Sequence, residues 1–178
     1  MSKIITTDTP VDTGIDTAHH TLSVYVNNKA GVLMRITQVF ARRGFNIDSL
    51  VVSQSRDTRY SRMTIGITGS SNGLEQIIKQ VTKLVDVIHC QEHSTKDAIV
   101  KEMLLVKFLV DTKKRTEALQ VIEHFGGKTL DLAPKAMTAI ITGDPGKIDA
   151  AINMLSVFEI IETVRTGKVV IARGKSAT

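Results

Sequence analysis

Apolar and polar residues alternate along the first half of the chain with two distinct periods. In two stretches the apolar residues recur every three or four positions, as in amphipathic helices: 31–44 and 72–85. In shorter stretches apolar residues alternate with polar ones or β-branched residues dominate, as in strands: 21–26, 46–55, 62–68 and 85–92. The predicted order of elements is therefore βαββαβ.

The same order recurs in the second half of the chain. Helical spacing is found in 112–127 and 144–158, strand patterns in 103–110, 128–134, 136–143 and 159–165, and a candidate seventh strand in 168–173. The tripeptide Ile-Thr-Gly stands at 67–69 and again at 141–143, both times at the end of a predicted third strand. This coincidence indicates a duplicated architecture.

Residues at the predicted helix starts agree with this reading. Asn72, with Glu75 three residues later, resembles a capping box. Asp144 is placed as an N-cap residue, and Pro145 as the first residue of its helix. A βαββαβ unit is the ferredoxin-like fold, an antiparallel sheet with both helices on one face. We therefore expect an α+β protein made of two tandem ferredoxin-like βαββαβ domains.

The domain bounds follow from these elements. We expect a disordered N-terminal tail (1–20), a first domain (21–94), a polar linker (95–102), a second domain (103–174) and a short tail (175–178). Each sheet is expected to leave the face opposite its helices bare. Because bare sheet faces and unpaired edge strands favour association, we expect an oligomer.

Composition narrows the classes of function. The 178 residues are 42% hydrophobic, which is enough for a packed core. Only 4% are aromatic, so few side chains could stack on nucleobases. The formal charge of +5 is scattered along the chain, so we expect neither a nucleic-acid partner nor a membrane surface. The single cysteine, Cys90, suits a reducing compartment. No apolar run approaches the length of a membrane span and no signal or transit peptide is apparent, so we expect a cytoplasmic protein.

Two binding classes are disfavoured by the residues themselves. An RNA-binding βαββαβ module needs aromatic residues on its two central strands, and residues 62–68 contain none. A metal site could be drawn from His89, Cys90 and His93, but neighbouring residues of a strand face opposite sides. The sequence also offers no second cluster to complete a tetrahedral shell. We therefore predict no metal ligands in this chain.

Catalysis is disfavoured as well. Residues 143–147 (GDPGK) suggest a phosphate loop, but the spacing of that motif is not met, and Asp144 and Pro145 are explained by the start of a helix. No nucleophile with a base beside it, and no carboxylate pair, can be recognised in the sequence. We expect no catalytic residue.

The turn between the first strand and the first helix is a candidate ligand site. Gly31 lets backbone approach a ligand closely, and the first N–H groups of a helix bind anions. Asn28 offers both a donor and an acceptor, and Asn46, at the start of the next strand, could add a third polar contact. Such a turn suits the carboxylate and amine of a free amino acid. On pattern alone, ordinary turn chemistry with Asn28 as a helix cap explains the residues more simply.

A family resemblance favours the ligand. The stretch LSVYVNNKAGVLMRITQVFARRGFNIDSLVVSQS, with SRMTIGITG, LEQIIKQVTKLVDVI, MLLVKF and RTGKVVIARG after it, resembles the small regulatory subunit of acetolactate synthase (acetohydroxyacid synthase). The likeness runs from about residue 21 to 174. The motif N-x-x-G-x-L followed by R-G-x-N matches at Asn28, Gly31, Leu33, Arg43, Gly44 and Asn46.

The resemblance implies both a site and a role. The first domain would be an ACT domain, in which Asn28 and Gly31 of one chain and Asn46 of a second chain hold valine or another branched-chain amino acid. Val32 and Leu33 would supply main-chain N–H groups. The chain would form a homodimer through its ACT domains.

The implied role is regulation without catalysis. The chain would activate a catalytic (large) subunit and confer feedback inhibition in branched-chain amino-acid biosynthesis. Thiamine diphosphate, magnesium and FAD would belong to that partner, and none of them to this chain. The alternative is an ACT sensor that regulates a different enzyme. The preferred amino acid, the stoichiometry and the docking surface are not given by the sequence.

Overall fold

The structure, a computed structural model, describes residues 18–175 and 178 of the chain. Its N-terminal half contains β1 (Ala18–Asn27), α1 (Val32–Arg42), β2 (Ile47–Gln54), β3 (Tyr60–Gly69), α2 (Ser71–Val81) and β4 (Val87–Glu92). The four strands form an antiparallel sheet in the order β2-β3-β1-β4. The predicted βαββαβ unit is therefore confirmed.

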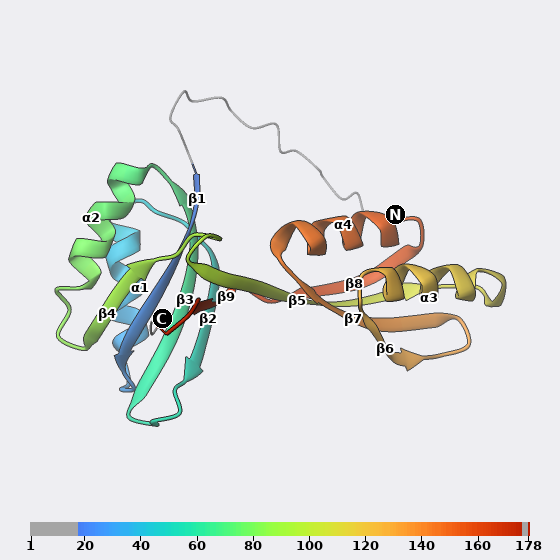
Figure 1. Cartoon of the computed structure of the whole chain (residues 1–178), viewed down its shortest axis with the longest axis horizontal. Coiled ribbons are helices and arrows are strands. Elements are labelled where there is room, and N and C mark those ends of the chain that lie inside the picture. The colour runs from blue at the N-terminus through green and yellow to red at the C-terminus, as the bar shows by residue number, and fades with distance from the viewer. Residues whose placement is uncertain (1–17, 176–177) are drawn as a thin grey trace.

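The N-terminal core lies between this sheet and its two helices (Figure 1). Alternate residues of β1, among them Leu22 and Val24, point toward the helices and are fully buried. Ile36 and Phe40 come from α1 at a spacing of four, and Ile77 from α2. The helical period and the strand period each place the apolar residues on one side of their element. Both sets of apolar residues therefore pack in this layer.

The C-terminal half repeats the plan. It contains β5 (Ala98–Leu109), a 3₁₀ turn η1 (Thr112–Lys114), α3 (Arg115–His124), β6 (Lys128–Leu132), β7 (Ala136–Gly143), α4 (Pro145–Leu155) and β8 (Glu159–Arg165). The strand order is β6-β7-β5-β8, and α3 and α4 lie together on one face (Figure 1). A second core forms there from residues such as Leu104, Phe108, Ile141 and Ile148.

A strand replaces much of the expected linker. Residues 95–102 were predicted to be a polar connection, but β5 begins at Ala98 and runs without interruption into the C-terminal sheet. Its first residues, Ala98–Lys101, pair with β9 (Val169–Ala172), the seventh strand of the second half. The extra length of β5 is explained by this partner, which supplies the backbone hydrogen bonds that a free linker would seek from water.

The back face of the N-terminal sheet is covered, contrary to the prediction that it is bare. Figure 1 shows β9 and the start of β5 crossing the sheet on the side opposite α1 and α2. Polar residues on that side, such as Ser23 and Thr64, are only 2% and 5% exposed. Gly167 lies so close that a Cβ there would be 3.0 Å from side-chain atoms of both Ser49 and Val51 of β2. The second half of the chain therefore shields the first.

The helix starts confirm one prediction and correct another. The carboxylate of Asp144 accepts a hydrogen bond from the backbone N–H of Lys147 at 2.9 Å, and Pro145 begins α4. The cap of α2, however, is Ser70, which accepts from Gly73 N–H at 3.3 Å, two residues before the predicted Asn72.

The predicted tails fall largely outside the described residues. The prediction of disorder for 1–20 concerns mainly 1–17, which are not described, while 18–20 belong to β1. At the other end, the hydroxyl of Thr178 accepts a hydrogen bond from Ala172 N–H at 2.7 Å. The described helices are all too short to span a membrane.

Candidate functional site

The turn before α1 has the backbone that its glycine permits. Gly31 is the N-cap residue, with φ of 80° in the left-handed region, and no side chain caps the helix. A Cβ at Gly31 would lie 3.3 Å from Nη1 of Arg35. Because the left-handed region is costly for residues with a Cβ, conformation as well as space favours glycine here.

The first N–H groups of α1 are available to a ligand. The N–H of Val32 makes only a long bond of 3.4 Å to Lys29 O, and that of Arg35 bonds to Gly31 O at 3.1 Å. Between them, the N–H groups of Leu33 and Met34 have no acceptor among the described residues. Of the two predicted backbone donors, Val32 buries its side chain in the core at 2% exposure, whereas Leu33 is 38% exposed.

Asn28 is not a helix cap. Its side-chain Nδ2 donates to the carbonyl of Thr58 at 3.0 Å, and its backbone N–H donates to Arg59 O at 2.7 Å. These bonds tie the turn to the loop between β2 and β3. With its amide nitrogen engaged, Asn28 offers its side-chain carbonyl oxygen as an acceptor, which suits an ammonium group. The simpler explanation of Asn28 as a cap is therefore wrong.

A charged cluster flanks the turn. Asp86 lies 2.5 Å from Nη2 of Arg35 and 3.6 Å from Nζ of Lys29. Desolvation of Asp86 acts to raise its pKa, but hydrogen bonds from Arg35 and Asn27, with the charges of Arg35 and Lys29, outweigh it and lower the pKa. Because two cations face one carboxylate, the cluster has a net positive charge, which favours an anion at the start of α1.

Asn46 lies at the opposite end of α1 from Gly31. It is exposed, and its Nδ2 donates to Oδ1 of Asp48 at 3.1 Å. The 11 residues of α1 separate the two ends by about 16 Å, at about 1.5 Å of rise per residue. One chain therefore does not bring Asn28 and Gly31 together with Asn46, and a site containing all three needs a second chain.

Exposed apolar residues lie beside both parts of this site. β2 is an edge strand, and its Leu50 and Val52 are 37% and 44% exposed. In the first turn of α1, Leu33 and Met34 are 38% and 64% exposed. An unpaired edge with apolar side chains is a surface that a second strand can cover.

The residues once considered for a metal site are separated by the structure. His89 is exposed and lies 3.0 Å from the side chain of Gln91, whereas Cys90 packs in the core. Burial raises the pKa of the Cys90 thiol to about 12. Within the described residues, no group of three His, Cys, Asp or Glu side chains is arranged to hold a metal.

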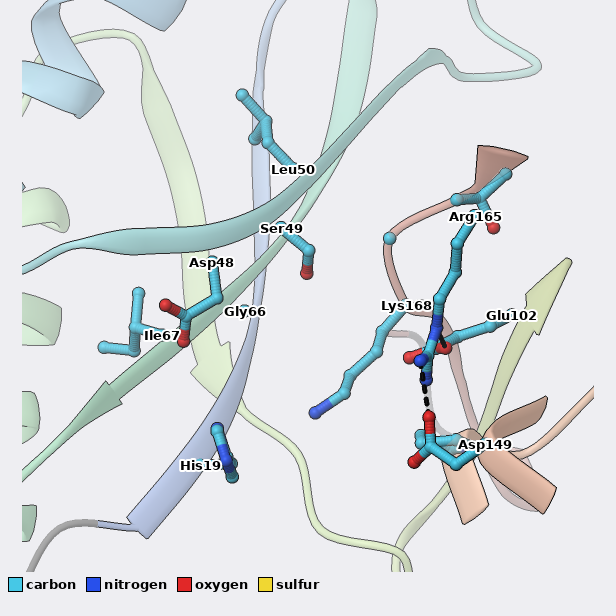
Figure 2. A pocket seen from close by; sticks show the side chains of 13 residues that line it. His19, Asp48, Ser49, Leu50, Gly66, Ile67, Glu102, Asp149, Arg165 and Lys168 are labelled. Carbon is cyan, nitrogen blue, oxygen red and sulfur yellow. Dashed lines mark hydrogen bonds and ion pairs between the residues drawn. The ribbon is translucent and has the colours of Figure 1, made fainter. Parts of the chain in front are cut away.

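Sequence reasoning missed a cavity of about 630 Å³ between the two halves (Figure 2). On its C-terminal side, Nε of Arg165 lies 2.5 Å from Glu102 and Nη1 lies 2.5 Å from Asp149. Asp48 and His19 lie on the N-terminal side, and Figure 2 shows Lys168 extending into the space between the two sides. These residues come from distant parts of the chain, so no local sequence pattern could predict that they line one cavity.

Known proteins resemble the chain over nearly its whole described length. Residues 22–89 match the model of the AHAS small subunit-like ACT domain, and residues 101–174 match that of the small subunit of acetolactate synthase. The acetolactate synthase small subunit of Mycobacterium bovis is 38% identical over 155 residues, which are 87% of this chain and 92% of that one. A probable small subunit from Methanothermobacter thermautotrophicus is 39% identical over 156 residues, covering 87% and 93%.

A solved structure agrees with these relatives. The crystal structure of the acetolactate synthase small subunit from Thermotoga maritima superposes with a TM-score of 0.81 at 35% identity, covering 89% of this chain and 99% of that one. Sequence and structure thus agree over both halves. The chain belongs to the family of acetolactate synthase small subunits, and its N-terminal half is an ACT domain.

Proposed function

We propose that this chain is the non-catalytic regulatory subunit of an acetolactate synthase and that it binds valine, or a related branched-chain amino acid, at the start of α1. The observation that carries the proposal is the Gly31 turn. There the N–H groups of Leu33 and Met34, which have no acceptor among the described residues, and the carbonyl oxygen of Asn28 lie close in sequence. An amino acid would place its carboxylate on the N–H groups and its ammonium on Asn28.

The complete site is formed by two chains. The far position of Asn46 is what a two-chain site requires, because Asn46 of one protomer can reach the turn of its partner only across an interface. The exposed edge of β2 and the apolar first turn of α1 support an interface on this side of the ACT domain. We therefore propose a homodimer through the ACT domains.

Regulation follows from linkage between binding and assembly. An effector that binds between two chains favours the dimer arrangement in which both parts of its site are correctly placed. If the catalytic subunit is less active with that arrangement, the effector inhibits it, and the coupling is reciprocal. In this proposal, thiamine diphosphate, magnesium and FAD are held by the catalytic subunit, and this chain activates that subunit when no effector is bound.

Calorimetric titration of the full chain with valine, leucine and isoleucine tests the effector site. Asn28→Ala should lower the affinity for the preferred amino acid at least about tenfold, because it removes a hydrogen bond to a charged group. Thermal stability should fall only slightly, because the bond that the variant removes within the protein, from Asn28 Nδ2 to the carbonyl of Thr58, is exposed. An unchanged affinity would count against the site.

Pyruvate consumption tests the regulatory role. The purified chain alone should consume none, and addition of it to the catalytic subunit should raise that subunit's rate. Pyruvate consumption by this chain without a partner would refute the proposal. Co-purification with a different enzyme, and with no acetolactate-forming one, would favour an ACT sensor instead.

A further inference from the structure

Asp48 stands at an irregularity of β2. The register of β2 on β3 shifts between Ile47 and Ser49, which pair with Ile67 and Gly66 in turn, so Asp48 is the additional residue of a β-bulge. A bulge re-aims the side chain of its extra residue and increases the local twist. Asp48 therefore leaves the regular alternation of the strand, and its direction cannot be read from the sequence pattern.

The carboxylate of Asp48 joins the proposed effector contact to the sheet. Its Oδ1 accepts from Nδ2 of Asn46 at 3.1 Å, and its Oδ2 accepts from Oγ1 of Thr68 at 2.7 Å. Oγ1 of Thr68 also lies 2.8 Å from Nδ1 of His19. Because the single hydroxyl proton of Thr68 goes to Asp48, His19 must donate from Nδ1. The chain of hydrogen bonds thus runs from β1 through β3 to Asn46.

The same two residues, His19 and Asp48, line the cavity between the halves (Figure 2). Across it, Arg165 is held by Glu102 and Asp149. Lys168, which extends into the cavity, has no carboxylate within ion-pair distance among the described residues. Asp48 is therefore in contact with Asn46 and also faces the second half of the chain.

We propose that Asp48 is a positioning residue that fixes Asn46 for the effector and couples the effector site to the cavity between the two halves. This inference rests on the proposed function, because it concerns regulation of the same site. With Nδ2 of Asn46 held by Asp48, the carbonyl oxygen of Asn46 is the group presented to a ligand. Asn28 has the same arrangement, with its Nδ2 on Thr58. Both asparagines can thereby offer their carbonyl oxygen as an acceptor, which suits a ligand with an ammonium group.

Coupling follows from the shared carboxylate. An effector that bonds to Asn46 restrains the Asn46–Asp48 pair and so the bulge that forms one side of the cavity. The 166–168 segment lies beside this bulge, since a Cβ at Gly167 would be 3.0 Å from Cβ of Ser49. Figure 2 shows Lys168 extending from this segment into the space between the two halves. A restraint on β2 should therefore also restrain residues 166–168. This segment connects β8 of the C-terminal sheet to β9, which covers the ACT domain.

Two variants separate positioning from coupling in the full chain. Asp48→Ala removes the acceptor of both Asn46 and Thr68, so valine affinity should fall about fivefold to tenfold. Thr68→Val keeps the Asn46–Asp48 bond but removes the hydroxyl that links Asp48 to His19. Its valine affinity should stay within about twofold of wild type. Asp131→Ala is the matched control, because Asp131 lies in the corresponding strand of the second half beside a similar register shift.

Amide hydrogen exchange in the 166–169 backbone, with and without saturating valine, provides the coupling readout. Wild type and Asp131→Ala should show slower exchange with valine, Thr68→Val a smaller effect, and Asp48→Ala none even at saturation. Wild-type affinity together with a wild-type exchange response in Asp48→Ala would overturn the inference, as would an equal affinity loss in Asp131→Ala. Absence of binding of all three branched-chain amino acids to the wild-type chain would instead refute the proposed function, and the inference with it.

Discussion

Nε of Arg165 donates to the carboxylate of Glu102 at 2.5 Å. Glu102 lies where β5 ends its pairing with β9 and enters the C-terminal sheet. Glu102 is a buried acid, with a side chain 5% exposed, whereas Arg165 is 34% exposed. Arg165 also reaches Asp149 of α4. One guanidinium therefore joins β8, β5 and a helix next to the cavity between the halves.

Loss of this guanidinium should destabilise the C-terminal half. We expect Arg165→Met to lower the free energy of unfolding by about 1–3 kcal/mol, because it leaves Glu102 buried without its partner. Urea denaturation followed by circular dichroism measures this. The control is Lys107→Met, which removes an exposed pair with Glu162 at 3.6 Å and should cost less than about 0.5 kcal/mol. Equal effects of the two variants would show that burial of Glu102 does not matter.

Charge at the turn should abolish effector binding. Gly31→Asp adds a carboxylate beside that of the effector, and at about 4 Å with an effective dielectric near 20 the repulsion is roughly 4 kcal/mol. The positive φ of Gly31 adds strain of about 1–2 kcal/mol, so the variant should fold with a lower melting temperature. Stimulation of the catalytic subunit should persist and inhibition by valine should disappear.

Gly31→Asn separates the two effects. Asparagine tolerates the left-handed region about as well as aspartate and has nearly the same shape, but it carries no charge. Its melting temperature should fall as in Gly31→Asp, while valine affinity should fall less. If both variants were inhibited at the wild-type valine concentration, the turn would not be the effector site.

The edge of β2 should be required for dimerisation. Val52→Lys places a charge on an exposed apolar position of this strand and should raise the dimer dissociation constant at least about tenfold. Sedimentation at micromolar concentration measures the change, and valine affinity at the same protein concentration should fall in parallel. Val85→Lys is the control, because Val85 is 96% exposed and lies between α2 and β4. A dimer that tolerates Val52→Lys would place the interface elsewhere.

The helix cap Asp144 should make stability depend on pH. The hydrogen bond from Lys147 N–H is the main cause that lowers its pKa below the ordinary value of 3.8. A carboxylate whose pKa is lowered by folding stabilises the fold above its unfolded pKa, and this contribution is lost as pH falls through the folded pKa. Asp144→Asn can still cap α4 but does not titrate, so its melting temperature should fall less than that of wild type between about pH 5 and pH 3. Parallel curves would contradict this assignment.

The parts of the fold that could be predicted are those that depend on the period of apolar residues. Leu22 and Val24 in β1, and Ile36 and Phe40 in α1, are buried because their spacing matches their element. The cap of α2 was misplaced because Asn72 and Ser70 are both acceptable caps, and only the backbone decides between them. The predicted linker failed because β9, which lies about seventy residues further along, gives residues 98–101 a partner.

The candidate site, like the fold, could be predicted from the sequence only in part. Gly31 and Asn28 could be chosen because glycine and asparagine at a strand-to-helix turn have a local chemical meaning. The bond from Asn28 to Thr58 could not, since it depends on a loop thirty residues away. The roles of Asp48 and Lys168 depend on a bulge and on the packing of two halves, and neither leaves a periodic signal.

The place of β9 in the sequence decides when the back face of the ACT sheet can be covered during synthesis. One of the strands that lie over the back of the ACT sheet is β9 (Val169–Ala172), which follows the whole C-terminal sheet in the sequence. The ACT domain leaves the ribosome first, yet the part of its cover that β9 supplies emerges only after β8. The C-terminal sheet and its helices emerge in the meantime. A nascent chain stalled before residue 169 would therefore carry an ACT domain whose back face lacks β9 and is partly open to solvent and to chaperones.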